Sequence, residues 1–274
     1  ILDNTGNNSD WIELYNSGSS VINIAGWNLS DDPLKTTKYA FPAGTAVPIN
    51  GFLRIWCSGR GSSVNAIGNI HTNFKLTQCN NDWIILSNGG VLVDSIQLRR
   101  TQATHSVGRK PDGSSTWNIF TAPTPNATNS STGYTSYAVR PAMNVPPGFY
   151  SGTKIVSLSA TPSNSLTIHY TTNGAEPTTA SAVYVSTPIT ISATSVIRAY
   201  AVSSNPSILP SFMETNTYLI NETIDSHYGV VSVSGGAQLD QLFGGTQNNP
   251  LTHLEYFENK LFKTEGYGGA DKHG

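Results

Sequence analysis

The chain has 274 residues, of which 38% are hydrophobic and 12% are charged, and its formal net charge is −2 at neutral pH. This balance argues against a nucleic-acid partner, because such binding usually needs a concentrated basic face. No apolar run approaches the roughly 20 residues that a membrane-spanning helix needs. The length suits two domains of about 100–150 residues each, with a remainder.

Short strands separated by tight turns are expected along the first half of the chain. Aromatic and β-branched residues, which suit half-buried strands, are concentrated in residues 10–16, 21–24, 39–41, 52–57, 83–86, 91–96 and 117–120. Asn88, Gly89 and Gly90 separate two of these segments and predict a hairpin, because Asn-Gly supplies the positive φ angles of its turn. Residues 30–33 predict another turn, in which aspartate bonds the backbone and proline blocks a ladder.

Three short segments of the first half also point to a family. In chain order, residues 10–16, 41–45 and 71–76 resemble the lamin-tail domain, an immunoglobulin-like β-sandwich that bacteria also place in secreted proteins. The resemblance continues to the end of a domain expected over residues 1–129. Relatives usually open with a further strand, so the start at Ile1 indicates a processed or trimmed N-terminus. Few apolar residues follow, and we expect a linker over residues 130–140.

A second domain is expected over residues 141–221. Its strand segments are residues 155–159, 166–172, 189–191 and 195–202. These segments, with Tyr-Thr-Thr-Asn-Gly at 170–174 and Glu-Pro-Thr at 176–178, resemble the small chitobiase/β-hexosaminidase C-terminal domain, which is also immunoglobulin-like. In those glycosidases the catalytic machinery lies in another domain. The resemblance therefore implies an accessory role and no catalytic residue.

The last part, residues 222–274, has a different pattern. Strands are expected over residues 229–234 and 252–257, and a short helix over 237–243, where Leu239, Leu242 and Phe243 have helical spacing. This order resembles the opening of a CotH-type domain, from a family of spore-coat and secreted proteins with an atypical kinase fold. The fold class expected for the whole chain is all-β: two tandem immunoglobulin-like β-sandwiches followed by a short mixed α/β fragment. The resemblance implies that phosphate and metal ligands would lie beyond Gly274.

One loop offers candidate metal ligands. Asp3, Asn7 and Asp10 supply oxygen atoms around a glycine, in a loose likeness to calcium loops. The spacing and the terminal glutamate of an EF-hand are missing, and an Asx-rich turn explains the same residues. A structural Ca²⁺ is the one cofactor that the sequence suggests.

Two cysteines offer a candidate disulfide. Cys57 ends one expected strand and Cys79 precedes another, so the two could meet. A bridge would stabilise the fold by roughly 3 kcal/mol in the chain-entropy model. The alternative is two unpaired thiols, one of them buried as a small apolar group.

Tryptophan is the best candidate for ligand contact. All five tryptophans fall in the first domain, and Trp11 and Trp27 are the candidates for stacking on a sugar, since an indole flanked by Asn and Asp suits a sugar face. No catalytic or cofactor-binding residue is expected. Adjacent Asp31 and Asp32 suit a turn. Three of the six histidines, His71, His105 and His169, are expected to be solvated or capped.

Together these features predict non-catalytic modules of a secreted or surface-attached bacterial protein. Their expected work is display, spacing and adhesive or glycan contact, with a cell-wall or extracellular polysaccharide or a surface protein as partner. One alternative is the N-terminal regulatory part of a CotH-like secreted kinase. Another is an accessory module of a polysaccharide-degrading enzyme.

Overall fold

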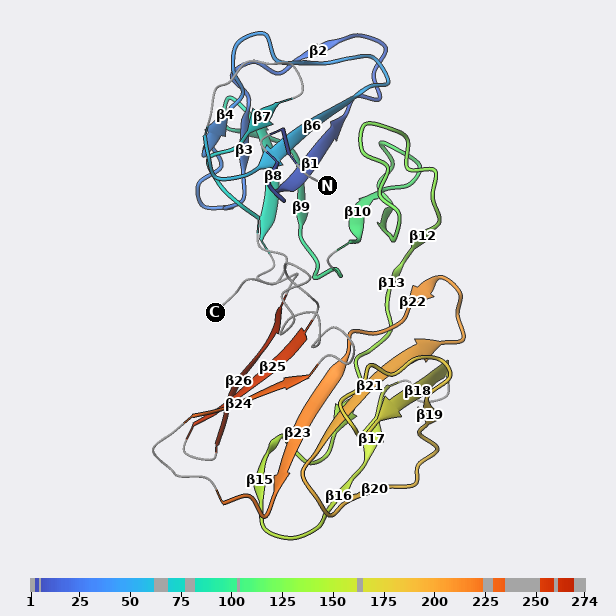
Figure 1. The fold of residues 1–274 in the computed structure, drawn as a ribbon. Coiled ribbons are helices and arrows are strands. Elements are labelled where there is room, and N and C mark those ends of the chain that lie inside the picture. The colour runs from blue at the N-terminus through green and yellow to red at the C-terminus, as the bar shows by residue number, and fades with distance from the viewer. Residues whose placement is uncertain are drawn as a thin grey trace. The chain divides into compact units, whose positions relative to one another are not determined.

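The computed structural model is all-β, and no α-helix occurs among the residues that it describes (Figure 1). Those residues are 3–4, 6–61, 69–76, 82–102, 104–161, 165–223, 229–234, 252–258 and 261–268. The expected all-β class is confirmed, while the helix predicted over residues 237–243 lies outside the described residues. No helix long and apolar enough to cross a membrane is found in the described parts. The chain divides into two units, Ile1–Gly133 and Tyr134–Gly274.

The first unit contains two main sheets and two smaller ones. One main sheet has the order β1-β6-β7, with bounds Asp10–Tyr15, Phe52–Cys57 and Ile70–His71. The other has the order β4-β3-β8-β9, with bounds Tyr39–Ala40, Asn28–Ser30, Trp83–Asn88 and Val91–Gln97. The smaller sheets pair β2 with β5, and β10 with β11 and β12; the bounds are Ile22–Asn23, Ala46–Val47, Ser106–Arg109, Trp117–Phe120 and Gly133–Tyr134.

The predicted hairpin is confirmed as β8 and β9. Asn88 is the last residue of its strand and pairs with Val91, so the two glycines alone form the turn. Gly89 and Gly90 have φ angles of 56° and 81°, which suit a turn that needs positive φ at both central residues. The turn expected at residues 30–33 also forms, because Asp32 accepts a hydrogen bond from the backbone N–H of Leu34 at 2.8 Å.

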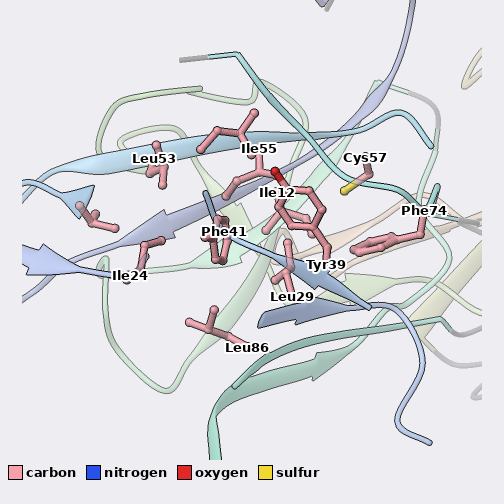
Figure 2. Close-up of a cluster of buried hydrophobic side chains, with 12 residues drawn as sticks. Ile12, Ile24, Leu29, Tyr39, Phe41, Leu53, Ile55, Cys57, Phe74 and Leu86 are labelled. Atoms are coloured by element: carbon pink, nitrogen blue, oxygen red, sulfur yellow. The ribbon is translucent and has the colours of Figure 1, made fainter. Parts of the chain in front are cut away.

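The core of the first unit lies between its two main sheets. Figure 2 shows Leu53 and Ile55 from β6 facing Leu29 and Leu86 of the other sheet, with Phe41 between them. Each of these side chains is at most 9% exposed. Because successive side chains of a strand point to opposite faces, these residues fix which face of each main sheet points inward.

The second unit is built on a five-stranded sheet with the order β15-β23-β21-β18-β19. The bounds are Gly148–Tyr150, Glu214–Ile220, Ser195–Ser203, Leu166–Thr171 and Ala182–Val183. Three two-stranded pairs complete its sandwich: β13 with β22, β14 with β17, and β16 with β20. Their bounds are Ser136–Tyr137, Ile208–Leu209, Ala142–Met143, Leu158–Ser159, Lys154–Val156 and Ile189–Ile191. A separate sheet of three strands, β24-β25-β26, has the bounds Val230–Ser234, Thr252–Glu258 and Leu261–Gly268.

The core of the second unit is formed by one face of the five-stranded sheet. Val156, Ile197 and Tyr218 are completely buried there, and the Tyr218 hydroxyl donates to the Val145 carbonyl at 2.8 Å. Burial raises the pKa of Tyr218 far above its ordinary value. Within the stretch expected to be a linker, β13 pairs with β22 and Ala138 joins this core, so residues 136–138 have fixed partners.

Candidate functional site

The outer face of the β1-β6 pair carries both polar and aromatic side chains. Ile12 and Ile55 point into the core, so their neighbours along each strand point the other way. Trp11, Glu13 and Tyr15 of β1 lie opposite Trp56, Arg54 and Phe52 of β6, in that order. The face therefore combines four aromatic rings with one acidic and one basic side chain.

Aromatic contacts organise this face. The rings of Tyr15 and Phe52 lie 4.8 Å apart between centroids, with an interplanar angle of 33°. The guanidinium of Arg54 lies 4.6 Å from the centre of the Trp56 ring, within the range of a cation–π contact. Trp56 is only 1% exposed, whereas Tyr15 is half-buried and can still offer a ring to a ligand.

A segment that is distant in sequence lies against the same face. We call residues 108–131 the flanking segment. The backbone N–H of Asn126 donates to the Glu13 carboxylate at 2.6 Å. Gly113 approaches so closely that a Cβ atom there would lie 3.3 Å from the Tyr15 ring, and its φ angle of +73° also favours glycine. The flanking segment is thus held next to Tyr15 and Glu13.

Glu13 is a carboxylate in a partly desolvated position. Burial raises the pKa of Glu13, while the hydrogen bond from Asn126 and the positive charge of Arg54 act in the opposite direction. The nearby charge of Asp112 raises this pKa further. The Glu13 carboxylate fastens the flanking segment through Asn126, which is a structural task rather than acid or base chemistry.

An open pocket of about 500 Å³ lies where Tyr15 meets the flanking segment. It is lined by Tyr15, Lys110, Pro111, Asp112, Thr128, Asn129 and Ser130. The ammonium of Lys110 donates to the carbonyl of Ser130 at 3.3 Å, and Asp112 accepts from the backbone N–H of Asn129 at 3.2 Å. Hydrogen bonds within the flanking segment therefore hold Lys110 and Asp112 in place. The opposite charges of these two side chains leave the pocket with little net charge.

The two tryptophans predicted as ligand contacts lie outside this pocket. Trp11 is half-buried on the same outer face, four residues before Tyr15, and pairs in register with Trp56. Trp27 packs against the core cluster of the first unit. Their roles in ligand binding stay predictions, and the pocket gives Tyr15 as the aromatic residue better placed for contact.

The negative charge of Asp3 is paired with a positively charged side chain of the same unit. The Asp3 carboxylate, whose side chain is fully buried, pairs with the Arg60 guanidinium at 2.9 Å. It also accepts hydrogen bonds from the Ser9 hydroxyl at 2.9 Å and the Asn7 backbone at 3.1 Å. Asp10 begins β1, opposite Cys57. Among the described residues, no group of three or more His, Cys, Asp or Glu side chains could hold a metal. The calcium site stays a prediction.

Chelation separates the two interpretations of this loop. Because Arg60 already neutralises Asp3, we expect EDTA to leave the melting temperature of the first unit unchanged, as followed by tryptophan fluorescence. The substitution Arg60→Ala should instead lower stability by about 1–3 kcal/mol, since it leaves a buried carboxylate without its charged donor. A melting temperature that falls with EDTA and recovers with calcium would establish the metal site.

His71 joins the N-terminal loop to the first sheet. Its side chain is 2% exposed, and both ring nitrogens have partners, so of the two expected states, solvated or capped, His71 is in the capped one. Nδ1 lies 2.9 Å from the Ser58 hydroxyl and Nε2 lies 2.7 Å from the Asn4 amide oxygen. Burial and the neighbouring Arg60 lower the pKa of His71, with Asp3 opposing them. A neutral His71 therefore acts as a structural bridge.

Cys57 is a buried thiol in the core of the first unit. Its side chain is 1% exposed. Burial raises the pKa of Cys57 and disfavours the reactive thiolate. Cys79 lies outside the described residues, so the disulfide stays a prediction.

Comparisons with known proteins support both domain resemblances. Residues 1–100 match the Lamin Tail Domain model, and residues 145–208 match the Chitobiase/beta-hexosaminidase C-terminal domain model. Neither match extends over residues 222–274. No curated protein and no solved structure matches the chain. The chain thus contains regions similar to two kinds of module that are non-catalytic and accessory in type.

Proposed function

We propose that these are extracellular modules of a secreted or surface-attached bacterial protein, and that the first unit binds a neutral carbohydrate. The observation that carries the proposal is the open pocket of about 500 Å³ beside Tyr15. The corresponding role of the two units together is display and spacing on a surface, with adhesive contact to polysaccharide.

The chemistry of the pocket suits a sugar. A pyranose presents C–H groups on one face and hydroxyls at its rim, so it favours an aromatic ring with amide, carboxylate and hydroxyl groups nearby. Tyr15 supplies the ring, while Asp112, Asn129 and Thr128 supply the polar groups. Since Lys110 and Asp112 oppose each other in charge, the pocket favours a neutral sugar over a polyanion.

The similarity of the second unit supports an extracellular setting. The family matched by residues 145–208 takes its name from chitobiase and β-hexosaminidase, which act on glycans. A module of that type beside a sugar-binding unit is consistent with adhesion to cell-wall or extracellular polysaccharide.

Removing the Tyr15 ring tests the proposal. We expect Tyr15→Ala to weaken binding to at least one of chitin, cellulose or peptidoglycan by about tenfold or more, a loss of roughly 1.4 kcal/mol. Tyr15→Phe should retain most of the affinity because it keeps the ring. Binding is measured by sedimentation with the insoluble polysaccharide.

The matched control is Tyr200→Ala. Tyr200 is also half-buried on a strand, and it stacks on His169 in the second unit, with ring centroids 5.6 Å apart. This variant should bind like the wild type. A loss with Tyr200→Ala but not with Tyr15→Ala would move the site to the second unit, and no binding by the wild type across the panel would remove the glycan role.

A second candidate is the regulatory front part of a CotH-like secreted kinase. It is favoured by β24 and β25, which lie where that resemblance expects strands. The parent reading frame decides the matter: continuation past Gly274 with a lysine and metal-binding aspartates would support the kinase. A glycosidase domain in the same frame would instead support an accessory module of a polysaccharide-degrading enzyme.

A further inference from the structure

The outer face of the five-stranded sheet in the second unit is covered. Ile197 of β21 and Tyr218 of β23 point into the core, so the alternate residues of those strands point outward. Arg198, Thr215 and Thr217 are such outward residues, yet they are 5%, 0% and 2% exposed. An uncovered face of an antiparallel sheet would leave them in contact with water.

The three-stranded sheet β24-β25-β26 provides the cover. His253, Glu255 and Phe257 alternate along β25 and are 0%, 0% and 1% exposed, whereas Leu254 between them is 38% exposed. The Phe257 ring meets Phe149 of β15 edge to face, with centroids 5.8 Å apart. Figure 1 shows this sheet beside β23. One face of the C-terminal sheet is therefore docked on the second sandwich.

Hydrogen bonds to one carboxylate join the two sheets. Glu255 accepts from the backbone N–H of Thr217 at 3.1 Å and also from the Thr217 hydroxyl. That hydroxyl lies 2.7 Å from the Ser232 hydroxyl on β24. Buried polar contacts of this kind fix one docking register, because any shift would leave donors without acceptors.

His253 occupies a site that disfavours a positive charge. Burial lowers the pKa of His253 to about 4, and the positive charges of Arg198 and Arg140 contribute to the decrease. Arg140 itself pairs with Glu214 of β23 at 2.8 Å. In register, β24 places Ser234 opposite His253, and β26 places Tyr267 there. On its own strand the nearest acidic residue of the docked face is Glu255.

We propose that the docked C-terminal sheet is an acid-released joint, held on the second sandwich at neutral pH and freed when His253 is protonated. This goes beyond glycan contact and does not depend on it. A released His253 in water binds a proton near its ordinary pKa of 6.5, whereas the docked one resists it down to about 4. Docking is therefore fully favoured above pH 6.5 and weakens as the pH falls, by about 70-fold between pH 7.5 and 4.5.

Hydrogen exchange on the full chain tests this joint. Protection factors, which correct for the intrinsic pH dependence of exchange, are measured for β24 and β25 from pH 7.5 to 4.5. We expect them to fall by about 70-fold in the wild type, while the amides of β18 and β21 inside the sandwich stay protected. In His253→Gln the fall should disappear, and His169→Gln, which changes a histidine on β18 of the five-stranded sheet, should behave like the wild type.

Two further variants keep the result decisive. Arg140→Gln removes one positive charge near His253, so protonation of the docked histidine becomes less costly and the loss of protection between pH 7.5 and 4.5 should be smaller than in the wild type. If His253→Gln does not dock at pH 7.5, an unchanged loss of protection in Arg140→Gln overturns the proposal. Constant protection of the wild type down to pH 4.5 would also overturn it. So would release that persists in His253→Gln and disappears in Glu255→Gln, because the proton would then act on the carboxylate.

Discussion

Replacing Phe41 with alanine is expected to destabilise the first unit by about 3–5 kcal/mol, the range for deleting a buried phenylalanine ring. Phe41 is 2% exposed and packs edge to face on Tyr39, with ring centroids 5.7 Å apart. It lies between the two main sheets, so the surrounding strands cannot close the cavity without moving apart (Figure 2). The melting temperature should fall by about 10–15 °C.

Tryptophan fluorescence is a selective reporter for this experiment. The five tryptophans lie between residues 11 and 117, within the first unit. The control is Leu34→Ala, because Leu34 is 92% exposed and its removal should leave the transition unchanged. Equal effects of the two substitutions would contradict the placement of the core.

Glu255→Ala is expected to loosen the C-terminal sheet at neutral pH. The substitution leaves the buried N–H and hydroxyl of Thr217 without their acceptor, at a cost of about 2–4 kcal/mol. Protection of β24 and β25 against hydrogen exchange at pH 7.5 should then fall by about 30-fold or more. The inner strands of the second sandwich should keep their protection.

Glu258→Ala is the matched control for that substitution. Glu258 belongs to the same strand, but its side chain is 53% exposed and lies 3.7 Å from Lys263. An exposed ion pair of this kind contributes little, about 0–1 kcal/mol. Similar losses of protection in both variants would contradict a specific role for Glu255 in docking.

Local sequence patterns were enough to predict many strands. Alternation in residues 10–16 identified β1, and Asn88-Gly89-Gly90 located the hairpin, although the glycines alone form its turn. The strand predicted over residues 252–257 appears as β25. These features depend on side-chain period and turn chemistry within a few residues, which a sequence displays directly.

The pocket could not be predicted in the same way. Tyr15 shares a face with Trp11, so alternation places both outward, but nothing local brings residues 110–130 against them. The ion pair of Asp3 could not be predicted from local sequence either, because its partner Arg60 is 57 residues away. An oxygen-rich loop resembles a calcium site in sequence when the positive charge that pairs with it comes from a distant part of the chain.

Burial of His253 and Glu255 was also beyond the sequence pattern. Polar residues alternating with Leu254 and Tyr256 suggest a strand whose polar face meets water. The structure reverses this, because the outer face of the second sandwich supplies Thr217 and Arg198 as polar neighbours. Polar burial of this kind depends on tertiary partners.

An NMR titration of the wild-type chain with soluble oligosaccharides of chitin, cellulose and peptidoglycan tests the proposed sugar site most directly. We expect one of these to shift the backbone signals of Tyr15, Asp112 and Asn129, which line the same pocket. The signals of the second unit should stay unchanged. Shifts confined to the second unit, or no shifts with any of the three sugars, would contradict the proposed site.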